Sequence, residues 1–236
     1  MNDLEGDYSY KASLCAFFRS MKSEGRNLLM DRVLAERTRY IAVGLENIYQ
    51  PHNASAVLRS CDCFGIQDVH IIENSYQYEL NPHVSLGAAQ WLNLYRYNSL
   101  ENNTPTCISH LKQEGYRVVA TTPDPKAVDI RDFDVSKGKF ALLFGTEKFG
   151  LTKEACDLAD EFVRIPMYGF TESFNISVSV SLCLFHFTDR MRTEKTNWQL
   201  TQNEQTDIYL QWYRNTITNS EVYERRFGHD YLSKTK

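Results

Sequence analysis

The sequence of 236 residues lacks the features that mark membrane and secreted proteins. No stretch approaches the roughly 18 uninterrupted apolar residues that a membrane-spanning helix needs. The first ten residues, MNDLEGDYSY, lack the charged and then apolar pattern of a secretory signal. These absences predict a protein that lies outside membranes and is located in the cytoplasm.

Cysteine patterns typical of metal sites are also missing. The six cysteines are scattered, and no two CxxC motifs occur that could enclose a zinc ion. Cys61 and Cys63 form a CxC pair, but the surrounding LRSCDCFGI reads as the end of a helix. We therefore expect reduced thiols and no metal ion.

The sequence has no excess of positive charge. Its 26 Lys and Arg residues face 30 Asp and Glu residues, which gives a formal net charge of −4. Proteins that bind nucleic acid nonspecifically usually carry a strong positive excess. A local basic surface could still contact phosphates, and its candidates are Arg19, Lys22, Arg26, Arg32, Arg37 and Arg39.

What the central part of the chain does contain is an alternation of strand and helix patterns. The expected strands are RYIAVGLENI, DVHII, the end of segment 83–97, YRVVATT, KFALLFG and EFVRIPM. Helices are expected after Pro51, with Asn53 as the N-cap, and in 83–97, 100–115, TKEACDLAD and 175–191. This order predicts an α/β fold with a mainly parallel sheet, helices on both faces, and ligands at the carboxyl ends of the strands.

The two ends of the chain read as helical extensions of this core. Residues 10–39 show apolar positions at spacings of three and four, which predicts helical structure. The last part is polar with a few aromatic residues and also favours helix. We therefore divide the chain into an N-terminal extension (1–39), a core domain (40–191) and a C-terminal extension (192–236).

Three segments carry the functional signal: ENIYQPHNASAVLRSCDCFGI, LLFGTEKFGL and IPMYGFTESFNISVSVSLCLF. Each alone is a weak motif, but their order, spacing and placement at strand ends make the combination specific. Together they resemble the three motifs of the SpoU branch of the SPOUT methyltransferases, from about Leu45 to Arg190. Within that family the resemblance is closest to the tRNA (guanosine-18) 2′-O-methyltransferases.

This resemblance implies a C-terminal trefoil knot, an exception to the rule that chains avoid knots. It also implies a homodimer in which each site borrows from its neighbour. The implied cofactor is S-adenosyl-L-methionine and the implied substrate is tRNA. The activity would be methylation of a ribose 2′-hydroxyl, on a guanosine of the D-loop.

The first segment places Asn53 and Arg59 at matching positions of the family. By the resemblance both are catalytic, and Arg59 assists at the hydroxyl together with an RNA phosphate. A guanidinium is a poor base, so we expect Arg59 to clamp phosphate and position the hydroxyl. From the residues alone, Asn53 reads as a helix cap and Arg59 as a surface arginine.

The second segment sets Gly145 and Gly150 around Glu147, directly after a buried strand. Glycine lets the backbone approach a ligand closely, and the resemblance implies that Gly145 contacts the cofactor and Glu147 the reaction centre. The alternative for Glu147 is a carboxylate that complements the dipole of the following helix.

In the third segment the resemblance implies that Ile165, Met167 and Phe174 line the cofactor pocket. Ser173 and Asn175 would belong to the reaction centre, or could instead cap the helix that follows. Phe174 replaces the leucine usual in the family.

One further change from the family pattern lies later in the third segment, where His186 replaces a common glutamate. Outside the motifs, Thr121 ends a strand at a position whose backbone touches the cofactor in the family, or is an ordinary strand-end threonine.

Three other functions compete with this hypothesis. A ribosomal RNA 2′-O-methyltransferase fits the same motifs, although the roughly 40 residues before the first strand are few for the separate RNA-binding domain that often accompanies those enzymes. A non-catalytic RNA-binding module is the second alternative. A nicotinamide-dependent enzyme is disfavoured because no GxGxxG follows the first strand.

Overall fold

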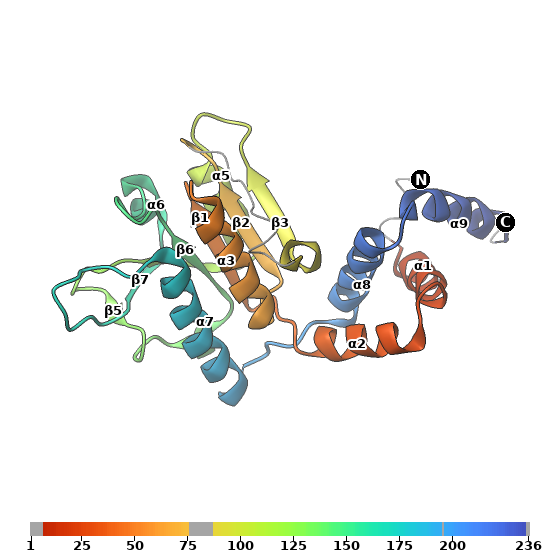
Figure 1. Cartoon of the computed structure of the whole chain (residues 1–236), viewed down its shortest axis with the longest axis horizontal. Coiled ribbons are helices and arrows are strands. Elements are labelled where there is room, and N and C mark those ends of the chain that lie inside the picture. The colour runs from red at the N-terminus through yellow and green to blue at the C-terminus, as the bar shows by residue number, and fades with distance from the viewer. Residues whose placement is uncertain (1–6, 76–86, 195, 235–236) are drawn as a thin grey trace. The chain divides into compact units, whose positions relative to one another are not determined.

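The computed structural model describes residues 7–75, 87–194 and 196–234. The chain divides into two compact units. One unit comprises Thr38–Trp198, and the other combines Met1–Arg37 with Gln199–Lys236. Figure 1 shows the order of the elements in each unit.

The unit of residues 38–198 is built on a seven-stranded sheet in the order β3-β2-β1-β6-β4-β7-β5. All its strand pairs are parallel, as the alternation of strands and helices predicted. The strands are β1 (Ile41–Glu46), β2 (Asp68–Ile72), β3 (Asn93–Tyr97), β4 (Arg117–Thr121), β5 (Val128–Asp129), β6 (Phe140–Phe144) and β7 (Glu161–Arg164). The short β5 was not predicted, because two residues in a Pro- and Asp-rich loop carry no readable periodicity.

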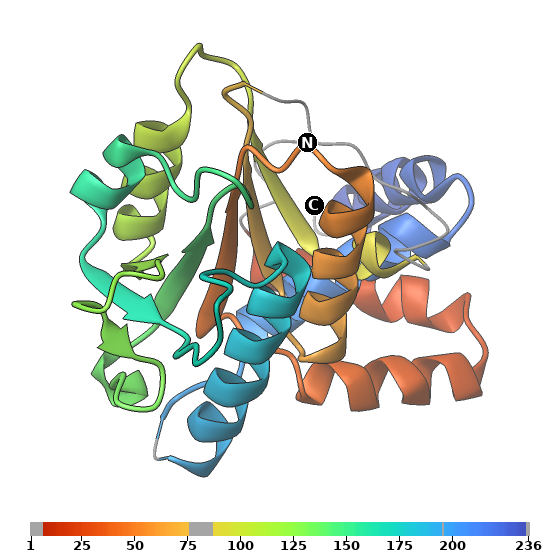
Figure 2. The same ribbon diagram turned by 60° about the vertical axis from the view of Figure 1, so that its left-hand side comes forward.

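Helices cover both faces of this sheet (Figure 2). They are α3 (Pro51–Cys63), α5 (Thr104–Gln113), α6 (Lys153–Leu158) and α7 (Ile176–Thr193), with short 3-10 helices η1 (Ala88–Trp91) and η2 (Val135–Lys137). The helix expected in segment 83–97 falls partly on residues 83–86, which lie outside the described residues. The described remainder forms only η1 before β3.

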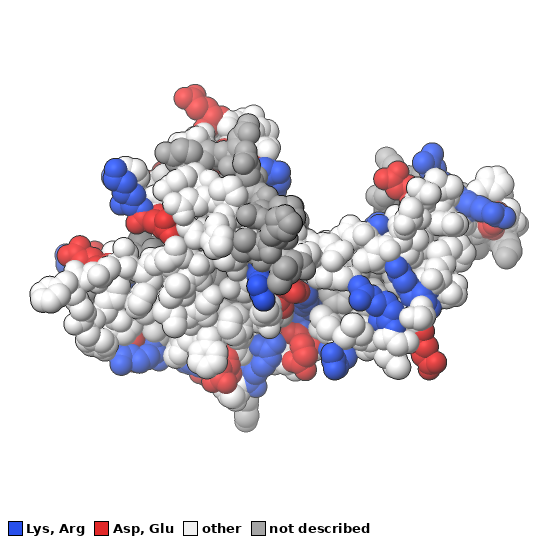
Figure 3. All heavy atoms as spheres, in the orientation of Figure 1, with Lys and Arg blue, Asp and Glu red and all other residues white. Residues whose placement is uncertain are grey.

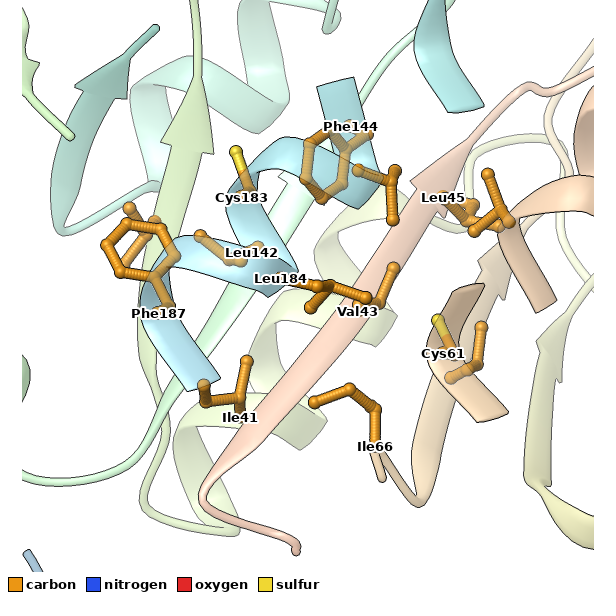
Figure 4. Packing of buried hydrophobic residues seen from close by; sticks show 14 of the residues in the cluster. Ile41, Val43, Leu45, Cys61, Ile66, Leu142, Phe144, Cys183, Leu184 and Phe187 are labelled. Carbon is orange, nitrogen blue, oxygen red and sulfur yellow. The ribbon is translucent and has the colours of Figure 1, made fainter. Parts of the chain in front are cut away.

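Alternating side chains of the central strands define two cores. Ile41, Val43 and Leu45 of β1 pack with residues of α3 and α7 (Figure 4). Ala42, which lies between them in the strand, packs in the cluster of α5 and α6. Because helices cover both faces, all six positions of β1 are buried, which explains why its first five residues, 41–45, carry no polar side chain.

The second unit consists of α1 (Tyr8–Ser20), α2 (Glu24–Ala35), α8 (Gln202–Thr216) and α9 (Ser220–Lys234). Residues 10–39, which we expected to be helical, form two helices, because the chain leaves the first helix after Ser20. Ser23 then starts α2 as an N-cap whose hydroxyl accepts a hydrogen bond from the Arg26 amide. The apolar spacing continues across this break, so periodicity alone did not reveal it.

Several of the expected phosphate-binding arginines are already engaged within the chain. Arg19 donates two hydrogen bonds to Asp31, at 2.8 and 2.7 Å. Arg37 is buried over the ring of Trp212, and Arg39 donates to Asp68 at 2.7 Å. Basic and acidic side chains are also interspersed in Figure 3. Three of the six candidates are therefore paired with a carboxylate or buried.

No helix among the described residues combines the length and apolar character that crossing a membrane would require.

Candidate active site

A pocket of about 410 Å³ lies where β4, β6 and β7 end. Its walls are residues 121–123 after β4, 144–151 after β6, 163–165 with Met167 after β7, and residues at the start of α7. Small-molecule sites usually have volumes of about 300–1,000 Å³. In open parallel sheets such sites form at the carboxyl ends of the strands, so both the volume and the position are those of a ligand site.

The pocket brings together residues that are far apart in the sequence. All five residues predicted to contact the cofactor line it, and so do Glu147 and Ser173 from the predicted catalytic set. The five are Thr121, Gly145, Ile165, Met167 and Phe174. The Thr121 hydroxyl donates to the Leu143 carbonyl at 2.8 Å, so this side chain is engaged within the sheet.

The loop after β6 needs glycine at two positions for different reasons, crowding at Gly145 and a positive φ at Gly150. A Cβ atom on Gly145 would lie 2.1 Å from the Gly150 carbonyl carbon and oxygen. Thr146 and Gly150 exchange backbone hydrogen bonds of 2.9 and 2.8 Å across the loop, and Gly150 has a φ of +69°. Glycine is required at both positions.

Beside this loop, one residue from each motif segment joins a hydrogen-bonded group. The side-chain amides of Asn53 and Asn175 donate to Oε1 of Glu147 at 2.9 and 2.6 Å. Asn175 also donates to Oδ1 of Asn53 at 3.2 Å. Asn53 is buried and lines a small recess with Thr146 and Glu147. Glu147 therefore connects this polar group to the pocket.

The prediction that Asn53 caps α3 was wrong. The helix begins at Pro51, and Gln50 occupies the N-cap position, where its side chain makes no capping hydrogen bond to the helix backbone. Proline fits the first helical position because its missing N–H would be unpaired there anyway. Asn53 lies within the first turn and donates to Gln50 Oε1 at 2.7 Å, so its side chain is free to serve the site rather than the helix end.

Capping and site contact coincide at Asn175. It is the N-cap of α7, and its Oδ1 accepts a hydrogen bond from the Ser177 amide at 2.9 Å. The same side chain donates to Glu147 through Nδ2. Ser173, the other candidate cap, lies before the N-cap position and lines the pocket instead.

Glu147 does not complement the dipole of the helix that follows it, which was the alternative for this residue. The N-cap of that helix, α6, is Thr152. The carboxylate at its amino end belongs to Glu46, which accepts a hydrogen bond from the Thr152 amide at 2.8 Å. Glu147 is turned toward Asn53 and Asn175.

Arg59 is separated from the other candidates. It is exposed on α3 and is not among the residues that line the pocket. Six residues of helix place it about 9 Å along the axis from Asn53. The structure therefore brings together four of the five predicted catalytic residues and leaves Arg59 on the surface.

The pocket also contains two cysteines that the motifs did not indicate. Burial raises the pKa of the Cys183 thiol to about 12, and burial also raises the pKa of Cys156. Both thiols are therefore protonated at neutral pH, and neither is a ready nucleophile. Among the described residues, no group of three or more His, Cys, Asp or Glu side chains could hold a metal ion.

Several wall residues were missed by the sequence analysis. Phe144 could have been found as the last residue of a buried strand, where ligand contacts concentrate. Cys156, Ser179 and Cys183 come from helices, and no local sequence signal marks their turn toward the pocket.

Fold and site together define a class: a parallel α/β protein in which two sequence motifs line a ligand pocket at the carboxyl edge of the sheet, and a third joins the adjoining polar group through Asn53. Comparison with known proteins identifies the family. Residues 40–185 match the SpoU rRNA Methylase family, and the chain belongs to it.

Individual relatives agree with this assignment. The chain is 39% identical over 195 residues to the tRNA (guanosine(18)-2'-O)-methyltransferase of Borreliella burgdorferi. The match covers 83% of this chain and 87% of the relative. The crystal structure of the A. aeolicus TrmH/SpoU tRNA modifying enzyme has a TM-score of 0.72 and 26% identity, covering 83% of this chain and 98% of that chain.

A second solved structure has a similar fold at lower identity. The SpoU methyltransferase AviRb from Streptomyces viridochromogenes, solved in complex with the cofactor AdoMet, has a TM-score of 0.56 and 21% identity. The match covers 70% of this chain and 62% of AviRb.

Proposed function

We propose that this protein methylates a ribose 2′-hydroxyl of tRNA, at a guanosine of the D-loop, and uses S-adenosyl-L-methionine as the methyl donor. The observation that carries the proposal is the convergence of three motif segments, far apart in sequence, on one hydrogen-bonded group beside a pocket that two of them line. The 39% identical relative is a tRNA methyltransferase for guanosine 18. A cytoplasmic location fits this substrate.

The pocket suits the proposed cofactor. Ile165, Met167 and Phe174 supply apolar surface, which suits an adenine ring, and the crowded Gly145 leaves main chain rather than a side chain at the wall. When bound, S-adenosyl-L-methionine supplies an electrophilic methyl group. The residues of this chain must then align the acceptor hydroxyl with it.

Glu147, Asn53 and Asn175 provide a rigid polar edge beside the pocket. Two amide donors converge on one carboxylate oxygen, which fixes the carboxylate orientation. The other oxygen, Oε2, accepts neither of these bonds and can accept a hydrogen bond from substrate. We assign this group to positioning of the target nucleoside, with Ser173 at the pocket wall as a further polar contact.

We further propose that a homodimer completes the site. Val178, Leu182 and Phe185 recur at helical spacing on α7, and Phe185 is 67% exposed. The neighbouring α3 carries the exposed Arg59, and the surface over α3 and α7 is largely uncharged in Figure 3. An exposed apolar face of this kind is typical of an interface, and a second copy would bring Arg59 to the partner's pocket.

In this arrangement Arg59 holds an RNA phosphate and the ribose hydroxyl. A guanidinium stays protonated at neutral pH and offers donors in a planar fork. It is therefore suited to binding oxygen atoms at the reaction centre and unsuited to removing a proton.

The test is incubation with total tRNA and methyl-labelled cofactor, followed by nuclease digestion and mass spectrometry of the modified nucleoside. A single 2′-O-methylguanosine in the D-loop is expected. Labelled ribosomal RNA with unlabelled tRNA would favour the ribosomal alternative. Cofactor binding without transfer to any RNA would favour a non-catalytic module.

A further inference from the structure

Glu46 is a buried acidic residue to which the motif comparison gives no role. It ends β1 and is 1% exposed. Its Oε1 accepts hydrogen bonds from the hydroxyls of Thr104 and Thr152, at 2.6 and 2.8 Å. Its Oε2 accepts one from the Thr152 amide at 2.8 Å. Burying a carboxylate without such donors is energetically costly, so the three hydrogen bonds stabilise Glu46 in this position.

The donors connect Glu46 to the pocket. Thr152 is the N-cap of α6 and directly follows Leu151, the last residue of the pocket loop 145–151. The N-terminal end of this loop continues directly from β6, and the Thr146–Gly150 backbone hydrogen bonds join its two sides. The contact with Glu46 therefore fixes the second end of the loop to the neighbouring strand β1.

We propose that Glu46 is a positioning residue for the methyl-donor pocket, which acts by holding the loop 145–151 in its binding conformation before the cofactor arrives. The inference rests on the proposed function, because it takes the pocket to be the site of S-adenosyl-L-methionine. If the loop is already ordered, binding carries no entropic cost of ordering it, and the affinity is higher. The effect of Glu46 should therefore appear in cofactor affinity.

A glutamine cannot reproduce these bonds, although it has the same shape. The Thr104 hydroxyl accepts a hydrogen bond from Asn74 at 2.9 Å, and the Thr152 hydroxyl accepts one from the Ala155 amide at 3.2 Å. Each hydroxyl therefore turns its single proton toward Glu46. An amide nitrogen at either carboxylate position would face a donor, so one orientation loses the Thr152 amide bond and the other loses the two hydroxyl bonds.

The test is Glu46→Gln in the full chain, with cofactor affinity measured by calorimetry and steady-state kinetics with tRNA. We expect the Kd and KM for S-adenosyl-L-methionine to rise about tenfold, while kcat at saturating cofactor changes less than threefold. A purely structural role would lower the folded fraction, and with it kcat per total protein, and would leave KM unchanged.

Two threonine substitutions provide matched controls. Thr104→Val and Thr152→Val each remove one hydroxyl donor from the same oxygen of Glu46, but only Thr152 adjoins the pocket loop. Thr152→Val should raise Kd severalfold, and Thr104→Val should leave it within about twofold. Thr152→Ser keeps the hydroxyl and should bind like wild type. Melting curves of every variant establish that folded protein is compared.

Hydrogen exchange of the ligand-free protein gives a second measurement. Amides of residues 146–152 should exchange faster in Glu46→Gln than in Thr104→Val. Equal Kd values and equal exchange in wild type and Glu46→Gln would overturn the inference. If wild type itself failed to bind S-adenosyl-L-methionine, the proposed function would fail instead, so the two failures are distinguishable.

Discussion

The pocket at the carboxyl edge of the sheet is built by residues of one chain, whereas the surface of α3 and α7 needs a second copy to perform its proposed role. The pocket has its walls, its crowded glycine loop and a hydrogen-bonded polar edge within residues 38–198. The α3–α7 surface presents the exposed Arg59 and a row of exposed apolar side chains, including Phe185.

This difference suggests a division of tasks. The pocket is preorganised by contacts within the chain, as a site for a small ligand should be. The RNA side of the reaction needs a guanidinium that the same chain places outside the pocket. If the site is shared between two copies, cofactor binding will survive changes on the α3–α7 surface, while methyl transfer will not.

The largest effect is expected from Arg59→Ala. We predict that methyl transfer falls at least about a hundredfold, a loss of about 2.7 kcal/mol in transition-state stabilisation. The Kd for S-adenosyl-L-methionine, measured by calorimetry, should stay within twofold. Arg59→Lys should not restore activity, because an ammonium lacks the planar fork. Retention of more than a tenth of wild-type turnover in Arg59→Ala would make this residue peripheral.

Mixed dimers test whether Arg59 acts across the interface. Arg59→Ala and Gly145→Ala chains, each inactive alone, are co-refolded in equal amounts. In half of the resulting dimers, one site combines an intact pocket with an intact Arg59 from the partner. Recovery of about a quarter of wild-type activity is expected for a twofold-symmetric shared site. No recovery would mean that Arg59 serves its own chain.

The second effect concerns the pocket itself. Gly145→Ala places a methyl group 2.1 Å from the Gly150 carbonyl, so the loop must open. Calorimetry should show cofactor affinity reduced at least about thirtyfold, about 2 kcal/mol, with dimerisation unchanged. Gly25→Ala is the matched control, since nothing lies within 4 Å of a Cβ there. Normal cofactor binding by Gly145→Ala would show that the loop does not form the binding wall.

The sheet and the pocket position were predictable from sequence because both depend on local patterns. The apolar run of β1 indicated a strand buried on both faces, and the motifs at strand ends located the walls. The break between α1 and α2 was missed, since apolar spacing continues past Ser23. The predicted capping role of Asn53 was wrong, because the helix begins at Pro51. Local sequence preference also cannot reveal that Asn53 bonds to Glu147, 94 residues away.

Other parts of the site depend on long-range geometry that no local pattern encodes. Glu46 looks like the polar end of a strand, and its role depends on Thr104 and Thr152. Two candidates for a local basic surface are engaged within the chain, because Arg19 pairs with Asp31 and Arg37 is buried over Trp212. The sequence shows neither contact. The trefoil knot and the homodimer stay predictions of the family resemblance.

A smaller effect is expected on the α3–α7 surface. Phe185→Glu places a charge in the proposed interface, and because Phe185 is 67% exposed the fold should tolerate it. Sedimentation should show at least about tenfold weaker dimerisation, and specific activity should fall on dilution. Leu100→Glu is the control. It introduces the same charge at another exposed apolar residue, 59% exposed, and should leave dimerisation and specific activity unchanged. A stable wild-type monomer at micromolar concentration would contradict the dimer proposal directly.

The smallest effect is expected from a test of whether the helical unit, formed by α1, α2, α8 and α9, contributes to RNA binding. Arg32 is exposed on α2, whereas Arg19 is neutralised by Asp31. If Arg32 contacts a tRNA phosphate, Arg32→Ala should weaken tRNA binding about two- to threefold at moderate salt and reduce the slope of log affinity against log salt by about one. Lys137→Ala removes the same charge just before β6, at the edge of the sheet opposite the pocket, and should change neither quantity. Equal salt slopes for Arg32→Ala and wild type would mean that the helical unit is structural and that the phosphate contacts lie on residues 38–198, near Arg59.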